Sequence, residues 1–156
     1  VRSRVARFLD PAGTDTYQVD QAREAILTGH LFGRGAGEGI VKHTLPDAHT
    51  DFIFAVLAEE FGILACLFLL TLYLLLVVRG FMHMMQQEDR FVFLALGGFL
   101  TLLALQVLVN IGVALQLLPT TGMTLPFISY GGSATISMSL CMGFTLALLR
   151  KRKLKV

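Results

Sequence analysis

An aspartate at the boundary between a polar segment and a long apolar stretch is the residue best placed for chemistry. Asp51 closely follows Asp47 and His49, and the apolar stretch begins at Phe52. A partly desolvated carboxylate with titratable neighbours can accept a proton from a substrate hydroxyl, as a general base does. A structural role also fits this position, because Thr50 or Asp51 suits the N-cap of a helix that begins there. The two roles are compatible.

Charged side chains on both sides of Asp51 are further candidates. Arg34, Lys42 and His49 could bind a phosphate group, although basic loop residues are more often simply solvated. Glu59 and Glu60 lie inside the apolar stretch, where ionisable side chains are costly and usually face a bundle interior or a cavity. The structural alternative for these glutamates is an ion pair with a basic residue on a helix outside this sequence.

Three apolar stretches must position these candidates. Of the 156 residues, 54% are hydrophobic and 15% are charged, the mean hydropathy is +0.68, and positions 61–78 and 91–149 contain no Asp, Glu, Lys or Arg. This composition excludes a soluble domain. A bilayer core needs roughly 20 apolar residues per helix. We therefore predict an all-α integral membrane protein with spans over about 52–79, 91–118 and 129–149.

Residues 1–51 are predicted to form a separate polar loop. Within it, Tyr17–Leu31 has the pattern of a short amphipathic helix, which Gly29 should end. The alternating glycines of Gly33–Gly39 indicate irregular backbone. Because the chain begins with Val1 and no secretory signal precedes the loop, we expect it to have been cut from a longer protein.

The distribution of basic residues predicts the orientation. The tail 150–156 carries five Lys or Arg residues, which places it in the cytoplasm. The charged connection 79–90 then lies inside as well, whereas residues 1–51 and the Gly/Pro-rich segment 119–133 lie outside. Irregular backbone near a membrane is tolerated only where it is buried in protein or lines a wet cavity. We therefore expect the functional site in a cavity between these two outer segments.

Several other features exclude functions or indicate packing. The net charge of +2 does not indicate a nucleic-acid partner, and no P-loop, Rossmann or zinc-ligand pattern is present. Cys66 and Cys141 lie within apolar stretches and are expected to be packing residues. Gln106 and Asn110, one helical turn apart in the second span, are expected to form hydrogen bonds between helices.

Two motifs together cover about a fifth of the chain. The first is LPDAHTDFIFA at 45–55, followed by AEEFG at 58–62; the second comprises 110–119, Gly122 and PFISYGGS at 126–133. They resemble the SEDS proteins, the peptidoglycan polymerases of the FtsW, RodA and SpoVE type. The sequence that leads to Asp51, GEGIVK at 37–42 and LPDAHTD at 45–51, is more similar to the FtsW branch, which acts in division. Gln116 departs from the family pattern, but the Ser-Tyr-Gly-Gly core is intact.

The resemblance implies a ten-span fold, of which this chain would supply a large extracytoplasmic loop and the last three spans. It also implies an enzyme of the bacterial inner membrane, at the division septum, that polymerises lipid II into glycan strands. Asp51 matches the family's essential aspartate, proposed as the general base, with undecaprenyl pyrophosphate as the leaving group. Substrate-binding candidates within the matched segments and nearby are His49, Lys42, Arg34, Glu59, Ser129, Tyr130, Gly131 and Gly132.

The same resemblance implies partners and leaves alternatives open. The expected partners are a class B penicillin-binding protein, which is a transpeptidase, and other division proteins of the membrane. A divalent cation, Mg²⁺ or Mn²⁺, is a possible cofactor, because a pyrophosphate leaving group needs positive charge. One alternative function is a lipid II flippase, in which Asp51 only caps a helix. The other is a scaffold without catalysis that positions the penicillin-binding protein.

Overall fold

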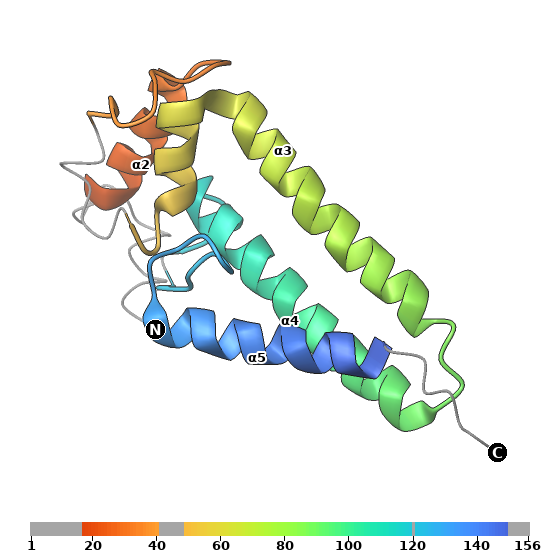
Figure 1. Ribbon diagram of the computed structural model, residues 1–156. Helices are drawn as coiled ribbons and strands as arrows, with labels where there is room; N and C mark the ends of the chain where they lie inside the picture. Colours follow the sequence, from red (N-terminus) through yellow and green to blue (C-terminus); the bar gives the residue numbers. More distant parts are fainter. Residues whose placement is uncertain (1–16, 41–48, 120, 150–156) are drawn as a thin grey trace.

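The computed structural model describes residues 17–40, 49–119 and 121–149. Every regular element in these ranges is a helix, as the composition predicts (Figure 1). The helices are α2 (Tyr17–Thr28), α3 (Ile53–Met84), α4 (Arg90–Ala114) and α5 (Gly132–Leu149). The last three are long and apolar enough to cross a membrane, with mean hydropathies of 2.8, 2.4 and 1.5 over their most apolar windows. The all-α membrane fold is therefore confirmed.

The helices are arranged around α4, which packs against both α3 and α5 (Figure 1). Helix α2 packs across the first turns of α3. Because α3 and α5 both begin where α4 ends, one end of the bundle gathers residues 49–52, 115–119 and 121–131, and we call it the site end. The opposite end carries the α3–α4 connection and the last residues of α5.

Buried side chains lie along the α3–α4 seam, while most large apolar side chains face outward. One cluster joins α2 to the start of α3 through Ala22, Ala25, Phe52 and Ala55. Others follow the seam toward the opposite end. Only 17%, 22% and 11% of the most apolar windows of the three long helices are buried within this chain. Such apolar surfaces are stable only against lipid or further helices, which fits a membrane location.

Helix α3 is broken at Gly62, which has φ +78° and ψ 179°. The break exposes carbonyls of the first half-helix and N–H groups of the second, and unsatisfied backbone groups in a membrane cost several kcal/mol each. The loop after α2 satisfies them. Its bonds are Arg34 N–H to Glu59 O (3.0 Å), Gly35 N–H to Glu60 O (3.1 Å), Ile63 N–H to His30 O (3.1 Å) and Leu64 N–H to Leu31 O (3.4 Å).

Glycines let this loop lie directly on the broken helix. A β-carbon at Gly33, which has φ +78°, would lie 2.1 Å from Glu60 O, and one at Gly29 would lie 1.8 Å from Ala58 O. Helix α2 therefore ends at Thr28, three residues before the predicted Leu31, at the point where the chain meets α3. The irregular backbone expected for the alternating glycines is confirmed. Among these glycines, Gly33 permits the close approach to Glu60 O, whereas a β-carbon at Gly37 would meet nothing within 4 Å.

Helix α4 ends at Ala114, four residues before the predicted end of the second span. Gln116 adopts φ +61°, its N–H donates to Val113 O (3.1 Å), and the Leu117 N–H donates to Gly112 O (2.8 Å). This pattern is a Schellman motif with glutamine at the position that glycine usually takes. It stops the apolar helix early and turns the chain into the segment that follows.

We expect Gly62→Ala to destabilise the protein by at least about 2 kcal/mol, because a β-carbon there would lie 2.4 Å from Leu31 O in a left-handed conformation. The matched control is Gly143→Ala in α5, where nothing lies within 4 Å of the added carbon. This control should gain about 0.5–1 kcal/mol from helix propensity. Thermal unfolding in detergent measures both. Equal melting temperatures for the two variants would show that the break in α3 is not a fixed feature.

Candidate functional site

Asp51 lies at the site end, in the turn that leads into α3. The helix begins at Ile53 and the cap position is occupied by Phe52, so neither Thr50 nor Asp51 is the N-cap. The capping interpretation of these two residues is therefore wrong. The physical reason is that hydrogen bonds from α4 and from the segment before α5 hold the 49–51 backbone outside the helix, while Phe52 is buried against α2 and α4.

Three consecutive carbonyl groups, at positions 49, 50 and 51, each accept a hydrogen bond from a distant part of the chain. The Tyr130 N–H donates to His49 O (2.8 Å). The Ser129 hydroxyl donates to Thr50 O (2.6 Å). The Asn110 amide, on α4, donates to Asp51 O (3.1 Å). We call residues 49–51 the pinned turn, because these three bonds define its path.

The donors of the pinned turn are themselves held in place. Ser129 Oγ also accepts from the Leu125 N–H (2.7 Å), and Asn110 Nδ2 also donates to Met123 O (2.6 Å). The Tyr73 hydroxyl of α3 donates to Pro126 O. Segment 121–131 is thus attached to α3, to α4 and to the pinned turn, so the two motifs that flank the spans in sequence form one unit.

The carboxylate of Asp51 lies beside Gly122. A β-carbon built on Gly122 would lie 3.5 Å from Asp51 Oδ2, and Gly122 has φ +74°, where L side chains are strained. Asp51 is neither fully buried nor fully exposed. Asp51 is therefore a partly exposed residue at the boundary of the apolar bundle.

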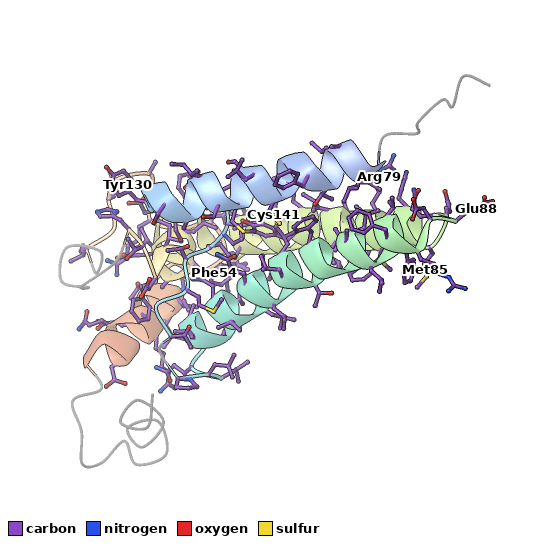
Figure 2. All side chains as sticks on the ribbon, turned by 90° about the horizontal axis from the view of Figure 1, so that it is seen from below. Phe54, Arg79, Met85, Glu88, Tyr130 and Cys141 are labelled. Carbon is purple, nitrogen blue, oxygen red and sulfur yellow. The ribbon has the colours of Figure 1, made fainter. Side chains whose placement is uncertain are left out.

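The other predicted site residues fall into two groups. His49, in the pinned turn, and Tyr130, which binds its carbonyl, are both exposed, with Tyr130 84% accessible, and Gly131 and Gly132 follow Tyr130 directly. Figure 2 shows Tyr130 at this end and Arg79, Met85 and Glu88 at the other. Ser129 is buried, and its hydroxyl supports the backbone.

Arg34 and Glu59 lie at the break in α3. The Arg34 N–H caps the first half-helix, and its side chain is exposed. Glu59 is 0% exposed and its Oε1 accepts from the Ile40 N–H (2.7 Å). A β-carbon at Gly39 would lie 2.9 Å from Glu59 Oε2. Lys42 lies outside the described residues.

The role of the two amides on α4 differs from the predicted one. Asn110 and Gln106 were expected to bond between helices, but they donate to loop carbonyls, Gln106 to Thr124 O at 3.0 Å. In the sequence, the two amides lie one turn apart in an uncharged span, which indicates a shared polar face on the helix. This pattern does not indicate which backbone carbonyls the face will bind.

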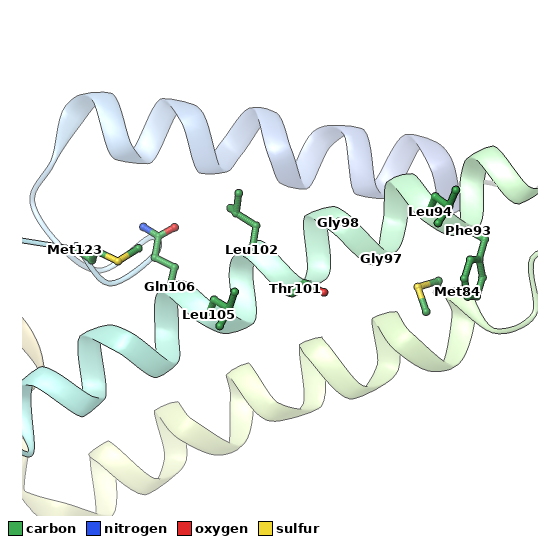
Figure 3. Close-up of a pocket in the computed structure, with 10 residues that line it drawn as sticks. All are labelled: Met84, Phe93, Leu94, Gly97, Gly98, Thr101, Leu102, Leu105, Gln106 and Met123. Carbon is green, nitrogen blue, oxygen red and sulfur yellow. The ribbon is translucent and has the colours of Figure 1, made fainter. Parts of the chain in front are cut away.

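Among the described residues, hollows also lie away from the pinned turn. One, of about 690 Å³, follows α4 from Met84 and Phe93 past Gly97 to Gln106 and Met123 (Figure 3). Another, of about 700 Å³, lies between α2, its following loop and Ile63. Among the described residues, no group of three or more His, Cys, Asp or Glu side chains has the geometry of a metal site.

Comparison with known proteins places the whole chain in one family. Residues 1–154 match the model of the FtsW/RodA/SpoVE family, described as cell cycle protein. A probable peptidoglycan glycosyltransferase FtsW of Caulobacter vibrioides is 51% identical over 152 residues, which are 97% of this chain and 39% of that protein. The peptidoglycan glycosyltransferase MrdB of Escherichia coli K12 is 40% identical over 158 residues, which are 98% of this chain and 43% of that protein.

Solved structures share the fold. A chain from a peptidoglycan synthase complex, studied for its coordination of polymerization and crosslinking, superimposes with a TM-score of 0.71 at 36% identity over 99% of this chain and 43% of that chain. A mutant of the rod shape determining protein RodA of Thermus thermophilus superimposes with a TM-score of 0.65 at 36% identity. The match covers 96% of this chain and 48% of the RodA chain. This chain spans about two fifths of the length of these relatives. With its motifs, its three apolar helices and these matches, the chain belongs to the FtsW/RodA/SpoVE family of SEDS proteins.

Proposed function

We propose that this chain carries the general base of a peptidoglycan glycosyltransferase that polymerises lipid II. The observation that carries the proposal is the pinned turn, in which three hydrogen bonds to consecutive backbone carbonyls hold Asp51 and the two residues before it at the end of a membrane bundle. The polar head of a lipid-linked sugar lies at the membrane surface, near the end of a membrane-spanning bundle. Two of the relatives bear the name peptidoglycan glycosyltransferase, which supports the same reaction class.

In this proposal Asp51 takes the proton from the 4-hydroxyl of the acceptor N-acetylglucosamine. The oxygen then forms a bond to C1 of the donor sugar, and the bond from C1 to the pyrophosphate oxygen breaks. Undecaprenyl pyrophosphate leaves with both bonding electrons, and C1 is inverted. A base with this task must lie within about 2.6–3.2 Å of the hydroxyl oxygen, so its backbone must be fixed before the substrate arrives.

The remaining residues divide between substrate contact and support. His49 and Tyr130, exposed beside Asp51, together with Gly131 and Gly132, would contact the sugar or phosphate groups. The cations Arg34 and Lys42, or a divalent Mg²⁺ or Mn²⁺ ion, would offset the charge of the leaving pyrophosphate.

Two of the proposed substrate residues are better placed as supports. Glu59 is completely buried against the Ile40 backbone and therefore holds the loop on α3. Ser129 is buried and holds Thr50, so its effect on substrate is exerted through the pinned turn.

We also propose the cellular setting. The related synthase complex coordinates polymerization and crosslinking, which supports a class B penicillin-binding protein as partner. The higher identity to an FtsW than to MrdB favours division, with other division proteins as further partners at the septum of the bacterial inner membrane. The site end would face the periplasm and the C-terminus the cytoplasm.

Asp51→Asn tests the proposed base. The amide keeps the shape of the side chain but cannot take up the proton, so lipid II polymerisation should fall by about 10²–10⁴-fold. The assay uses a polypeptide of the relatives' length that contains this sequence, purified with its transpeptidase. Monodispersity and partner binding should stay as in the wild type.

The same variant separates the alternative functions. A lipid II flippase, or a scaffold that only positions the penicillin-binding protein, would form no glycan strands in this purified assay even as the wild type, because neither polymerises lipid II. A wild type that forms strands, together with an Asp51→Asn variant that forms them at the same rate, would show a polymerase in which Asp51 is only structural. Either result would reject the proposed chemistry.

The orientation is testable with single cysteines in a protein lacking Cys66 and Cys141. Thr121→Cys lies at the site end and Glu88→Cys lies in the α3–α4 connection, and both positions are exposed. A maleimide that cannot cross membranes should label Thr121→Cys in cells with a permeable outer membrane, and should label Glu88→Cys only after lysis. The opposite pattern would invert the proposed topology.

A further inference from the structure

We infer that Asn110 is the positioning residue that sets the location of the catalytic base. This inference rests on the proposed role of Asp51. Asn110 lies in the last two turns of α4 and is 1% exposed, so it has no surface for substrate contact. Its effect on the reaction must therefore pass through the backbone groups that it binds.

Both hydrogens of the Asn110 amide are used. Nδ2 donates to Asp51 O at 3.1 Å and to Met123 O at 2.6 Å. The first bond fixes the main chain that carries the carboxylate. The second fixes the residue next to Gly122, which is the neighbour of that carboxylate. The Asn110 amide thus sets the distance between the Asp51 carboxylate and the backbone at Gly122.

The amide is held there at an energetic cost. Asn110 Oδ1 is buried and has no hydrogen-bond donor among the described residues. A buried polar atom without a partner costs about 1–3 kcal/mol, so part of what the two bonds contribute is lost. Neighbours on the same stretch of α4, Val107, Ile111 and Ala114, are apolar and buried. The asparagine is therefore explained by the geometry it imposes on the loops more than by its contribution to packing.

Gln106 provides an internal comparison one turn earlier on α4. Its Nε2 donates to Thr124 O at 3.0 Å, so it also anchors segment 121–131. The pinned turn takes its three bonds from Tyr130, Ser129 and Asn110, not from Gln106. If Asn110 only held the loop to the helix, removing either amide would have the same effect on the reaction.

The size of the expected effect follows from the distance tolerance of proton transfer. A displacement of about 1 Å at a reacting group can lower a rate by about 10²-fold. Without the Asn110 bond, Asp51 O loses its anchor to α4, and the carboxylate can drift while substrate binding elsewhere persists. The predicted signature is a lower kcat with an unchanged KM.

The test compares Asn110→Ala with Gln106→Ala in a polypeptide of the relatives' length that contains this sequence, purified with its transpeptidase and supplied with lipid II. We expect Asn110→Ala to lower kcat about 10- to 100-fold and to leave KM within about threefold. Gln106→Ala should keep kcat within about threefold of the wild type. Rates are expressed per amount of monodisperse protein. Asn110→Ser, whose hydroxyl is too short to bridge both carbonyls, replaces the alanine variant if that variant does not fold.

Asp51→Asn is measured in the same series so that the two proposals can fail separately. If Asp51→Asn is inactive but the Asn110 and Gln106 variants have equal kcat, the positioning role is overturned and the proposed function stands. A rise in KM alone for Asn110→Ala also overturns the positioning role. If Asp51→Asn polymerises at the wild-type rate, the proposed function is overturned, and the positioning role falls with it.

Discussion

Three hydrogen bonds to the carbonyls of His49, Thr50 and Asp51 are the constraint on which the site end depends. They join the turn before α3 to the C-terminal part of α4 and to the segment before α5, so one short stretch of backbone connects all three long helices. Two of the donors, on Asn110 and Ser129, are buried, and the third is the backbone N–H of Tyr130, whose side chain is exposed. The position of Asp51 is therefore a property of the bundle as a whole.

The break in α3 solves a second problem of the same kind. An apolar helix interrupted at Gly62 would leave backbone groups unsatisfied, and the loop after α2 supplies the partners. The buried Glu59 holds that loop by accepting from the Ile40 N–H. The first half of α3 is thus held by this loop on its outer side and by α4 along the seam. The pinned turn fixes the N-terminal end of that half-helix, and the loop after α2 fixes its C-terminal end.

Much of the architecture was predictable because it depends on local composition. The three apolar helices, the short helix beginning at Tyr17 and the irregular glycine stretch follow from hydropathy and backbone freedom. Their ends were less predictable: α2 ends at its contact with α3, and α4 ends in a Schellman motif at Gln116, a residue whose identity does not indicate a helix end. Asp51 was placed correctly at the start of the first span but was wrongly offered as its cap.

The sequence by itself determined that this chain is a three-helix membrane segment of the SEDS family and which residue types can do chemistry in it. Transfer of apolar side chains out of water and local helical hydrogen bonding specify that much without knowledge of neighbours. Only the tertiary structure decided that Asn110 binds the carbonyl of Asp51 and that Ser129 binds the carbonyl of Thr50, across 59 and 79 positions of sequence. The physical reason is that their partners are backbone carbonyls, which every residue carries, so the amino-acid letters do not indicate which carbonyl a buried amide or hydroxyl will bind.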